Sequence, residues 1–156
     1  METKFQNDML LESKGTQDRF LVFTIDGQNY GIEIHYITEI IEVMPATVVP
    51  FLPACMKGII NLRGSIIPLM DVRLRFGLPE KEYTEQTCII VLDNDGISLG
   101  LIVDAVQEVT DIPEDQRMPP PTGQGEDSRY IKGVGNADGQ IQLLLDCDQL
   151  MAIQQG

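Results

Sequence analysis

The chain has 156 residues, of which 43% are hydrophobic, enough for one ordinary domain or two very small intertwined ones. Its formal net charge of −13 disfavours nucleic acid and anionic membrane surfaces as partners, because both demand a positive field. Three widely separated cysteines without a CxxC pair favour buried thiols in a reducing compartment over a disulfide framework.

The first 17 residues are polar, and we expect a flexible N-terminal tail over 1–17 and a folded domain over 18–156. This tail lacks the basic and apolar regions of a signal peptide. No apolar run approaches the roughly 20 residues that a membrane helix needs. These features predict a cytoplasmic protein without direct membrane insertion.

A β-hairpin is predicted at the start of the domain. Residues 20–25 are β-branched and aromatic, Asp26-Gly27 is a turn signal, and residues 30–34 alternate as the return strand. The next stretch is ambiguous. Ile37, Ile40 and Ile41 fit helical spacing, whereas Ile37, Glu39 and Ile41 fit one face of a strand.

A second hairpin is predicted over Lys57–Asp71, with Arg63 on its tip. Two apolar runs flank Asn61-Leu62-Arg63-Gly64, which favours a type I turn closed by Gly64 in the left-handed conformation. Asp71 is a plausible N-cap for a short helix over residues 72–76, ended by Gly77 and Pro79.

The second half of the chain repeats this plan. Gly100 matches Gly31 (100 − 31 = 69), and Lys132 matches Lys57 (132 − 57 = 75). The six-residue difference between the two offsets falls in a Pro- and Gly-rich loop that begins at Met118. Short strands in two copies with matched turns predict two small β-barrels packed along an apolar seam.

No catalytic or metal-binding constellation is evident. The only histidine, His35, sits in a strand-like run, where a packed or surface role outweighs that of a base. One histidine and scattered cysteines show no zinc spacing, and Walker and GxGxxG loops are absent. We therefore expect no enzyme, metal or cofactor. The alternative, a small acidic enzyme or ligand-binding barrel, would show turnover or a retained metabolite.

The two hairpin tips differ in charge. Arg63 of the first tip becomes Asp138 in the second. An arginine beside the bulky Leu62 suits a protein interface, and the alternative is a solvated turn residue. Glu39 is a candidate partner for an arginine, although Glu108 at the matching position also fits an outward-facing strand residue.

Two further residues, Ile34 and Ile37, either line an exposed groove or fill a barrel, and the core is the more common place for an isoleucine.

The chain resembles the CheW family of bacterial chemotaxis coupling proteins from about Phe20 to Met151. The segments that carry the resemblance are FLVFTIDGQNYGIEI, ITEI, KGIINLRGSIIPLMDVRLRF, CIIVLDNDGISLGLIVDAVQEV and YIKGVGNADGQIQLLLD. The resemblance implies a mainly β fold: two pseudo-duplicated, intertwined five-stranded SH3-like barrels, with short helices after Asp71 and near the C-terminus.

The same resemblance implies a non-enzymatic adaptor of two-component signal transduction. Such an adaptor binds the cytoplasmic tip of a chemoreceptor (methyl-accepting chemotaxis protein) and the regulatory domain of the histidine kinase CheA. It is a monomer alone and assembles in membrane-associated receptor arrays in the cytoplasm. The pathway can be flagellar, or a pilus or other chemosensory system.

Site residues carry over from the family position by position. They are Arg63, Glu39, Ile37, Gly58, Ile34 and Ile66, with Leu62 beside the arginine and Cys88 at a position where relatives often have valine. The 118–128 loop departs from the family pattern, because Thr122-Gly123 follows Pro121 where relatives can carry a phenylalanine.

Overall fold

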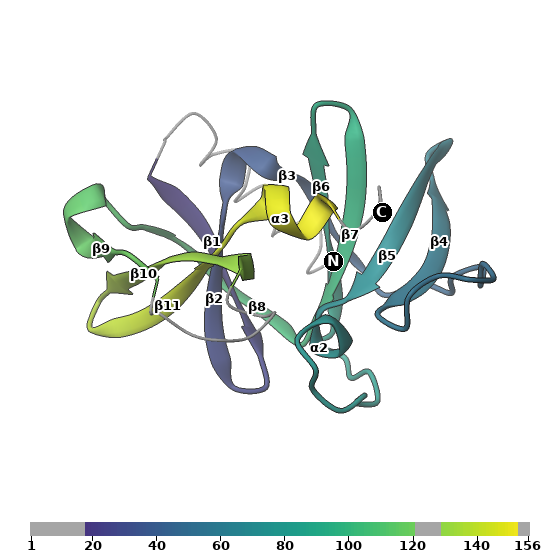
Figure 1. Cartoon of the computed structure of the whole chain (residues 1–156), viewed down its shortest axis with the longest axis horizontal. Coiled ribbons are helices and arrows are strands. Elements are labelled where there is room, and N and C mark those ends of the chain that lie inside the picture. The colour runs from purple at the N-terminus through teal and green to yellow at the C-terminus, as the bar shows by residue number, and fades with distance from the viewer. Residues whose placement is uncertain (1–17, 121–128, 153–156) are drawn as a thin grey trace.

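The structure is a computed structural model that describes residues 18–120 and 129–152, and it is mainly β with two sheets and few short helices (Figure 1). The six-stranded sheet has the spatial order β8 (Ala105–Asp111), β1 (Arg19–Ile25), β2 (Gln28–Glu33), β11 (Gln140–Leu145), β10 (Ile131–Ala137), β9 (Arg117–Met118). The five-stranded sheet has the order β3 (Ile37–Glu42), β6 (Cys88–Asn94), β7 (Ile97–Val103), β5 (Ser65–Asp71), β4 (Met56–Leu62). The mainly β class is confirmed. The predicted tail over 1–17 and most of the 118–128 loop lie outside the described residues.

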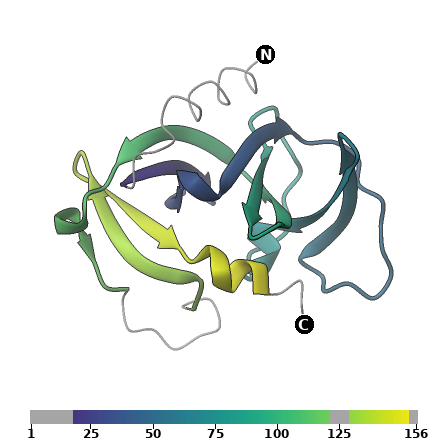
Figure 2. The same ribbon diagram turned by 90° about the horizontal axis from the view of Figure 1, so that it is seen from above.

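The duplication is realised as an exchange of hairpins between the sheets. Each half of the chain gives its first hairpin to one sheet, and its third strand and second hairpin to the other. In each sheet, the exchanged hairpin pairs with its neighbour through two parallel strands. These pairs are equivalent in the two copies: Gly31 of β2 lies opposite Leu144 of β11, and Gly100 of β7 lies opposite Leu69 of β5. Neither half of the chain therefore holds a complete sheet, and the two sheets lie side by side (Figure 2).

The four hairpins share one turn geometry. Each has a two-residue loop whose residues both have positive φ, at Asp26-Gly27, Arg63-Gly64, Asp95-Gly96 and Asp138-Gly139. This pattern belongs to the type I′ turn, whose twist matches that of the flanking strands. The prediction of a type I turn at Arg63 is therefore wrong, because the strands pair up to Leu62 and Ser65 and leave only two residues for the loop.

The segment that follows β3 closes the five-stranded sheet toward a small barrel, and the segment that follows β8 does the same for the six-stranded sheet. Beyond β3, the Thr47 and Ile59 backbones exchange hydrogen bonds of 2.8 and 2.9 Å along the open edge of β4. Beyond β8, the 3₁₀ turn η2 (Glu114–Gln116) leads to β9, which pairs with β10. The extra two-residue strand β9 is the one departure from the predicted five strands per barrel.

The ambiguous stretch after β2 is a strand, preceded by the 3₁₀ turn η1 (Ile34–Tyr36). The pairing of β3 with β6 shifts register between Ile37 and Glu39, and that of β8 with β1 shifts at the equivalent point. The bulge lets both Ile37 and Ile40 face the interior, which explains the helix-like spacing of the isoleucines.

The largest hydrophobic cluster lies along the seam between the sheets. It draws on both, with residues such as Phe23 and Ile32 from the six-stranded sheet and Ile90 and Leu101 from the five-stranded one. Two smaller clusters lie apart from it, one built on the five-stranded sheet and the other around Phe20. All three cysteines are buried and free, as predicted.

Two short helices follow the second hairpins, as predicted. Helix α2 (Val72–Arg75) is capped by Asp71, whose side chain accepts hydrogen bonds from the backbone N–H groups of Arg73 and Leu74. Helix α3 (Cys147–Met151) is capped in the same way by Asp146. Across residues 18–120 and 129–152, neither helix has the length and hydropathy needed to span a bilayer.

Candidate partner-binding site

The tip of the β4–β5 hairpin presents Arg63 to solvent. The arginine side chain is 70% exposed, and its backbone has a positive φ of 52°. Asn61 braces the turn, since its Oδ1 accepts a hydrogen bond of 2.9 Å from the Gly64 N–H. The three other turns carry aspartate at the arginine position. Aspartate tolerates positive φ better than arginine does, so the turn geometry alone does not explain the choice of arginine.

The Arg63 side chain forms an ion pair with Glu39 on β3. The Glu39 side chain is only 17% exposed, and its hydrogen bond to Arg63 raises the pKa of the guanidinium. Because β3 and β4 are the two edges of the five-stranded sheet, the pair joins those edges. The second half of the chain has Glu108 and Asp138 at the matching positions, where two acids cannot make such a pair.

Gly58 is buried on β4 and touches the chain that closes the barrel. A Cβ atom added at Gly58 would lie 2.3 Å from the Thr47 carbonyl oxygen, and its φ of +135° is one that other residues rarely adopt. The glycine permits the Thr47–Ile59 pairing. The structure therefore gives Gly58 a role in positioning the loop that contains Thr47.

Three of the predicted site residues are buried in the seam. Ile34, Ile37 and Cys88 all belong to the main hydrophobic cluster, and Ile37 is fully buried. The interpretation in which Ile34 and Ile37 line an exposed groove is corrected by this burial, and the alternative core role holds. The bulge and the 3₁₀ turn in this segment direct both side chains inward.

Two other predicted residues flank the arginine on the same hairpin. Ile66 is 58% exposed on β5, where it pairs with Asn61 across the hairpin. Leu62 is half-buried against the smaller cluster of the five-stranded sheet. The structure thus brings together the exposed Arg63 and Ile66 with the partly buried Glu39 and Leu62.

An exposed apolar loop was not singled out from the sequence. Between β3 and β4, Val48 is 79% exposed and Phe51 is fully exposed with a φ of 68°. Prolines at 45, 50 and 53 give this stretch the composition of a connecting loop. The sequence signal for this surface is the apolar character of Val48, Val49, Phe51 and Leu52 in a connecting segment, which lies on the surface in most proteins.

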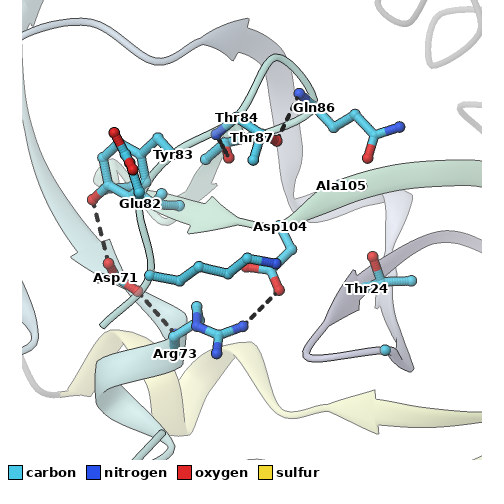
Figure 3. Close-up of a pocket in the computed structure, with 13 residues that line it drawn as sticks. Thr24, Asp71, Arg73, Glu82, Tyr83, Thr84, Gln86, Thr87, Asp104 and Ala105 are labelled. Atoms are coloured by element: carbon cyan, nitrogen blue, oxygen red, sulfur yellow. Dashed lines mark hydrogen bonds and ion pairs between the residues drawn. The ribbon is translucent and has the colours of Figure 1, made fainter. Parts of the chain in front are cut away.

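The structure also contains a polar cavity of about 210 Å³ beside α2 (Figure 3). Its lining is mixed in charge, with Asp71, Arg73, Lys81, Glu82 and Asp104 among its residues. The Tyr83 hydroxyl donates to Asp71 Oδ2 at 3.3 Å, and burial raises the pKa of this phenol. Within the described part of the chain, no group of three or more His, Cys, Asp or Glu side chains is placed to hold a metal.

Comparison with known proteins gives a consistent family. The family model described as the CheW-like domain matches residues 19–155. The chain is 31% identical over 137 residues to the chemotaxis protein CheW of Klebsiella aerogenes, covering 87% of this chain and 82% of that protein. It is 34% identical to the chemotaxis protein CheW of Bacillus subtilis, covering 87% and 88%.

A solved structure agrees with these relatives. The scaffolding protein TtCheW from Thermoanaerobacter tengcongensis superposes with a TM-score of 0.78 at 33% identity, covering 84% of this chain and 90% of that one. The family model spans most of the chain, and the relatives above 30% identity are matched over more than two thirds of their length. This chain belongs to the CheW-like family.

Proposed function

We propose that this chain is a non-enzymatic chemotaxis adaptor that couples the cytoplasmic tips of chemoreceptors to the regulatory domain of the histidine kinase CheA. It thereby places kinase activity under receptor control, in the cytoplasm at membrane-associated receptor arrays. The names of its relatives support this role, since they are chemotaxis proteins and the solved relative is a scaffolding protein.

The observation that carries the proposal is the placement of Arg63. The residue occupies a turn position that the fold elsewhere fills with aspartate, and it is exposed yet held by Glu39. A charge held in one place on a rigid hairpin fixes the register of a bound partner and raises the association rate. It contributes to these two properties more than to the affinity itself. Arginine is also among the residues enriched at interface hot spots.

The apolar part of the contact comes from the same hairpin. Ile66 is exposed and Leu62 half-buried next to Arg63, so a partner helix can bury their side chains while the arginine contacts its polar rim. A receptor tip is a helical hairpin, and a small contact of this kind suits a reversible signalling complex. The exposed loop with Val48 and Phe51 adds a second apolar area on the five-stranded sheet.

Binding measurements on two matched variants test the proposal. Arg63→Asn keeps a residue that tolerates positive φ but removes the charge, and Asp138→Asn does the same on the other hairpin. We expect Arg63→Asn to weaken binding of a receptor signalling fragment by about tenfold or more, as at a hot spot. Asp138→Asn should bind as the wild type does.

The folded state has to be followed in the same variants. Arg63→Asn and the charge reversal Arg63→Glu should both keep the cooperative melting transition of the wild type. Unchanged receptor affinity in both Arg63 variants, or loss of the melting transition, would contradict the assignment of this residue as a contact.

A further inference from the structure

Arg73 of α2 is a nearly buried cation with three hydrogen-bonded partners. Its side chain is 9% exposed, and Nη1 donates to Asp104 Oδ2 at 2.8 Å (Figure 3). Nη2 contacts Asp26 Oδ1 at 3.3 Å, and Nε donates to the Pro79 carbonyl at 3.1 Å. The planar guanidinium fork thus has all its nitrogens engaged in fixed directions.

The partners of Arg73 come from different parts of the fold. Asp26 lies in the β1–β2 turn of the six-stranded sheet, whereas α2 follows directly from β5 of the five-stranded sheet. Asp104 stands between β7 and β8, where the chain passes from one sheet to the other. Its Oδ2 also accepts the Asp26 backbone N–H at 2.8 Å. One cluster therefore ties a turn, a crossover and a helix together.

The opposite end of the seam lacks this cluster, although the duplication provides the matching positions. The residue equivalent to Arg73 is Asp148 (148 − 73 = 75), and the residue equivalent to Asp104 is His35 (104 − 35 = 69). Within the described part of the chain, the Asp148 side chain accepts one hydrogen bond, from Asn94 Nδ2 at 2.6 Å. The two ends of the seam are thus joined by quite different interactions.

Aromatic contacts reinforce the end that holds Arg73. Phe76, the residue after α2, has its ring 5.4 Å from that of Tyr30 on β2 and 6.3 Å from that of Tyr130. The Arg75 guanidinium lies 4.5 Å from the centre of the Tyr130 ring. These contacts hold α2 against residues of the six-stranded sheet and of the segment before β10.

We propose that Arg73 is a positioning residue that fixes the orientation of the six-stranded sheet relative to the five-stranded sheet. The seam is a layer of mostly apolar side chains, and the hydrophobic effect of burying them stabilises contact but is not directional. The forked hydrogen bonds of a nearly buried arginine are directional, and they join the two sheets at one end. At the opposite end, the equivalent helix position holds the Asn94–Asp148 hydrogen bond in place of a forked, nearly buried arginine. Loss of the Arg73 cluster therefore leaves the angle between the sheets less restrained.

The position of Arg73 also matters for signalling, a consequence that depends on the proposed function. β5 runs from the Arg63 turn to Asp71, and the Asp71 side chain caps the helix that holds Arg73. A partner bound at the Arg63 turn is therefore connected through one strand and one cap to the contact with the other sheet.

Residual dipolar couplings of the free, ¹⁵N-labelled full chain test the proposal without any partner. In the wild type, backbone N–H couplings from both sheets should fit one alignment tensor. In Arg73→Gln, we expect the couplings of each sheet to fit a tensor of its own, with the two tensors rotated relative to each other. A residue that only stabilised the fold would lower the melting temperature and leave one common tensor.

Matched variants separate the cluster from general effects. Asp104→Asn and Asp26→Asn remove charges that contact Arg73, and both should also split the tensors. Asp95→Asn changes the equivalent turn, and Asp148→Ala removes the bond at the opposite end, so both should keep one tensor. If Arg73→Gln does not fold, Asp104→Asn decides the question. A single common tensor in the folded cluster variants would overturn the proposal, whatever the protein binds.

Discussion

Replacing Gly58 with alanine is expected to open the closure of the five-stranded sheet. The new methyl group would lie 2.3 Å from the Thr47 carbonyl oxygen, and the backbone would have to keep a φ of +135°. A residue held in such a conformation costs about 1–3 kcal/mol. Relief of the clash moves Thr47 away and weakens its two hydrogen bonds with Ile59, which contribute about 0.5–1.5 kcal/mol each. The free energy of unfolding should therefore fall by about 2–6 kcal/mol.

Urea unfolding at 25 °C measures this change, and amide hydrogen exchange locates it. The amides of Thr47 and Ile59 should lose protection in Gly58→Ala, while those of β6 and β7 keep it. The matched control is Gly133→Ala at the equivalent position, where the added Cβ lies 3.1 Å from the Met118 carbonyl oxygen and φ is not in the positive range. There we expect a change within about 1 kcal/mol. Equal stability of Gly58→Ala and the wild type, with both amides still protected, would refute this reasoning.

Three further predictions concern the core, a cap and a thiol. Ile37→Ala should lower the free energy of unfolding, measured in urea, by about 2–5 kcal/mol because the side chain is fully buried. Ile66→Ala, at an exposed position, should change it by no more than about 0.5 kcal/mol. Equal changes in the two variants would contradict the burial of Ile37. Asp71→Ala should lower the free energy of unfolding by about 1–3 kcal/mol because the backbone amides of α2 and the Tyr83 hydroxyl lose their hydrogen-bond acceptor. Asp71→Asn keeps a side-chain oxygen and should retain most of the stability of the wild type. Burial raises the pKa of the Cys147 thiol, so the unfolded chain ionises first as pH rises. The contribution of this thiol to the free energy of unfolding should then decline above about pH 9 by about 1.4 kcal/mol per pH unit. A Cys147→Ser variant with the same alkaline slope as the wild type would count against this cause.

Much of the fold could be predicted because turn chemistry is local. Asp26-Gly27 and Asp95-Gly96 mark their hairpins in the sequence, and Asp71 marks the start of a helix. The repeat at two constant offsets then fixed the order of the elements. The exchange of hairpins between the sheets was not predictable in this way. Pairing partners such as Gly31 and Leu144 are far apart in the chain. No local sequence pattern indicates whether a hairpin pairs with strands of its own half of the chain or of the other half.

The candidate site was predictable only in part. Charge asymmetry between the two tips identified Arg63, and the ion pair with Glu39 follows once the edges of the sheet meet. Alternation could not place Ile37, because a bulge next to it changes which residues face inward. The exposure of Phe51 depends on a loop conformation with positive φ, which its residue type does not suggest.

The central claim is that this chain brings kinase and receptor into one functional assembly. Its most direct test is co-sedimentation with a receptor signalling fragment and CheA, with kinase activity measured in the sedimented complex. The account predicts that the wild-type chain joins the complex and raises receptor-controlled kinase activity, and that Arg63→Glu does neither while remaining folded. A wild-type chain that stays in the supernatant and leaves kinase activity unchanged would contradict the account.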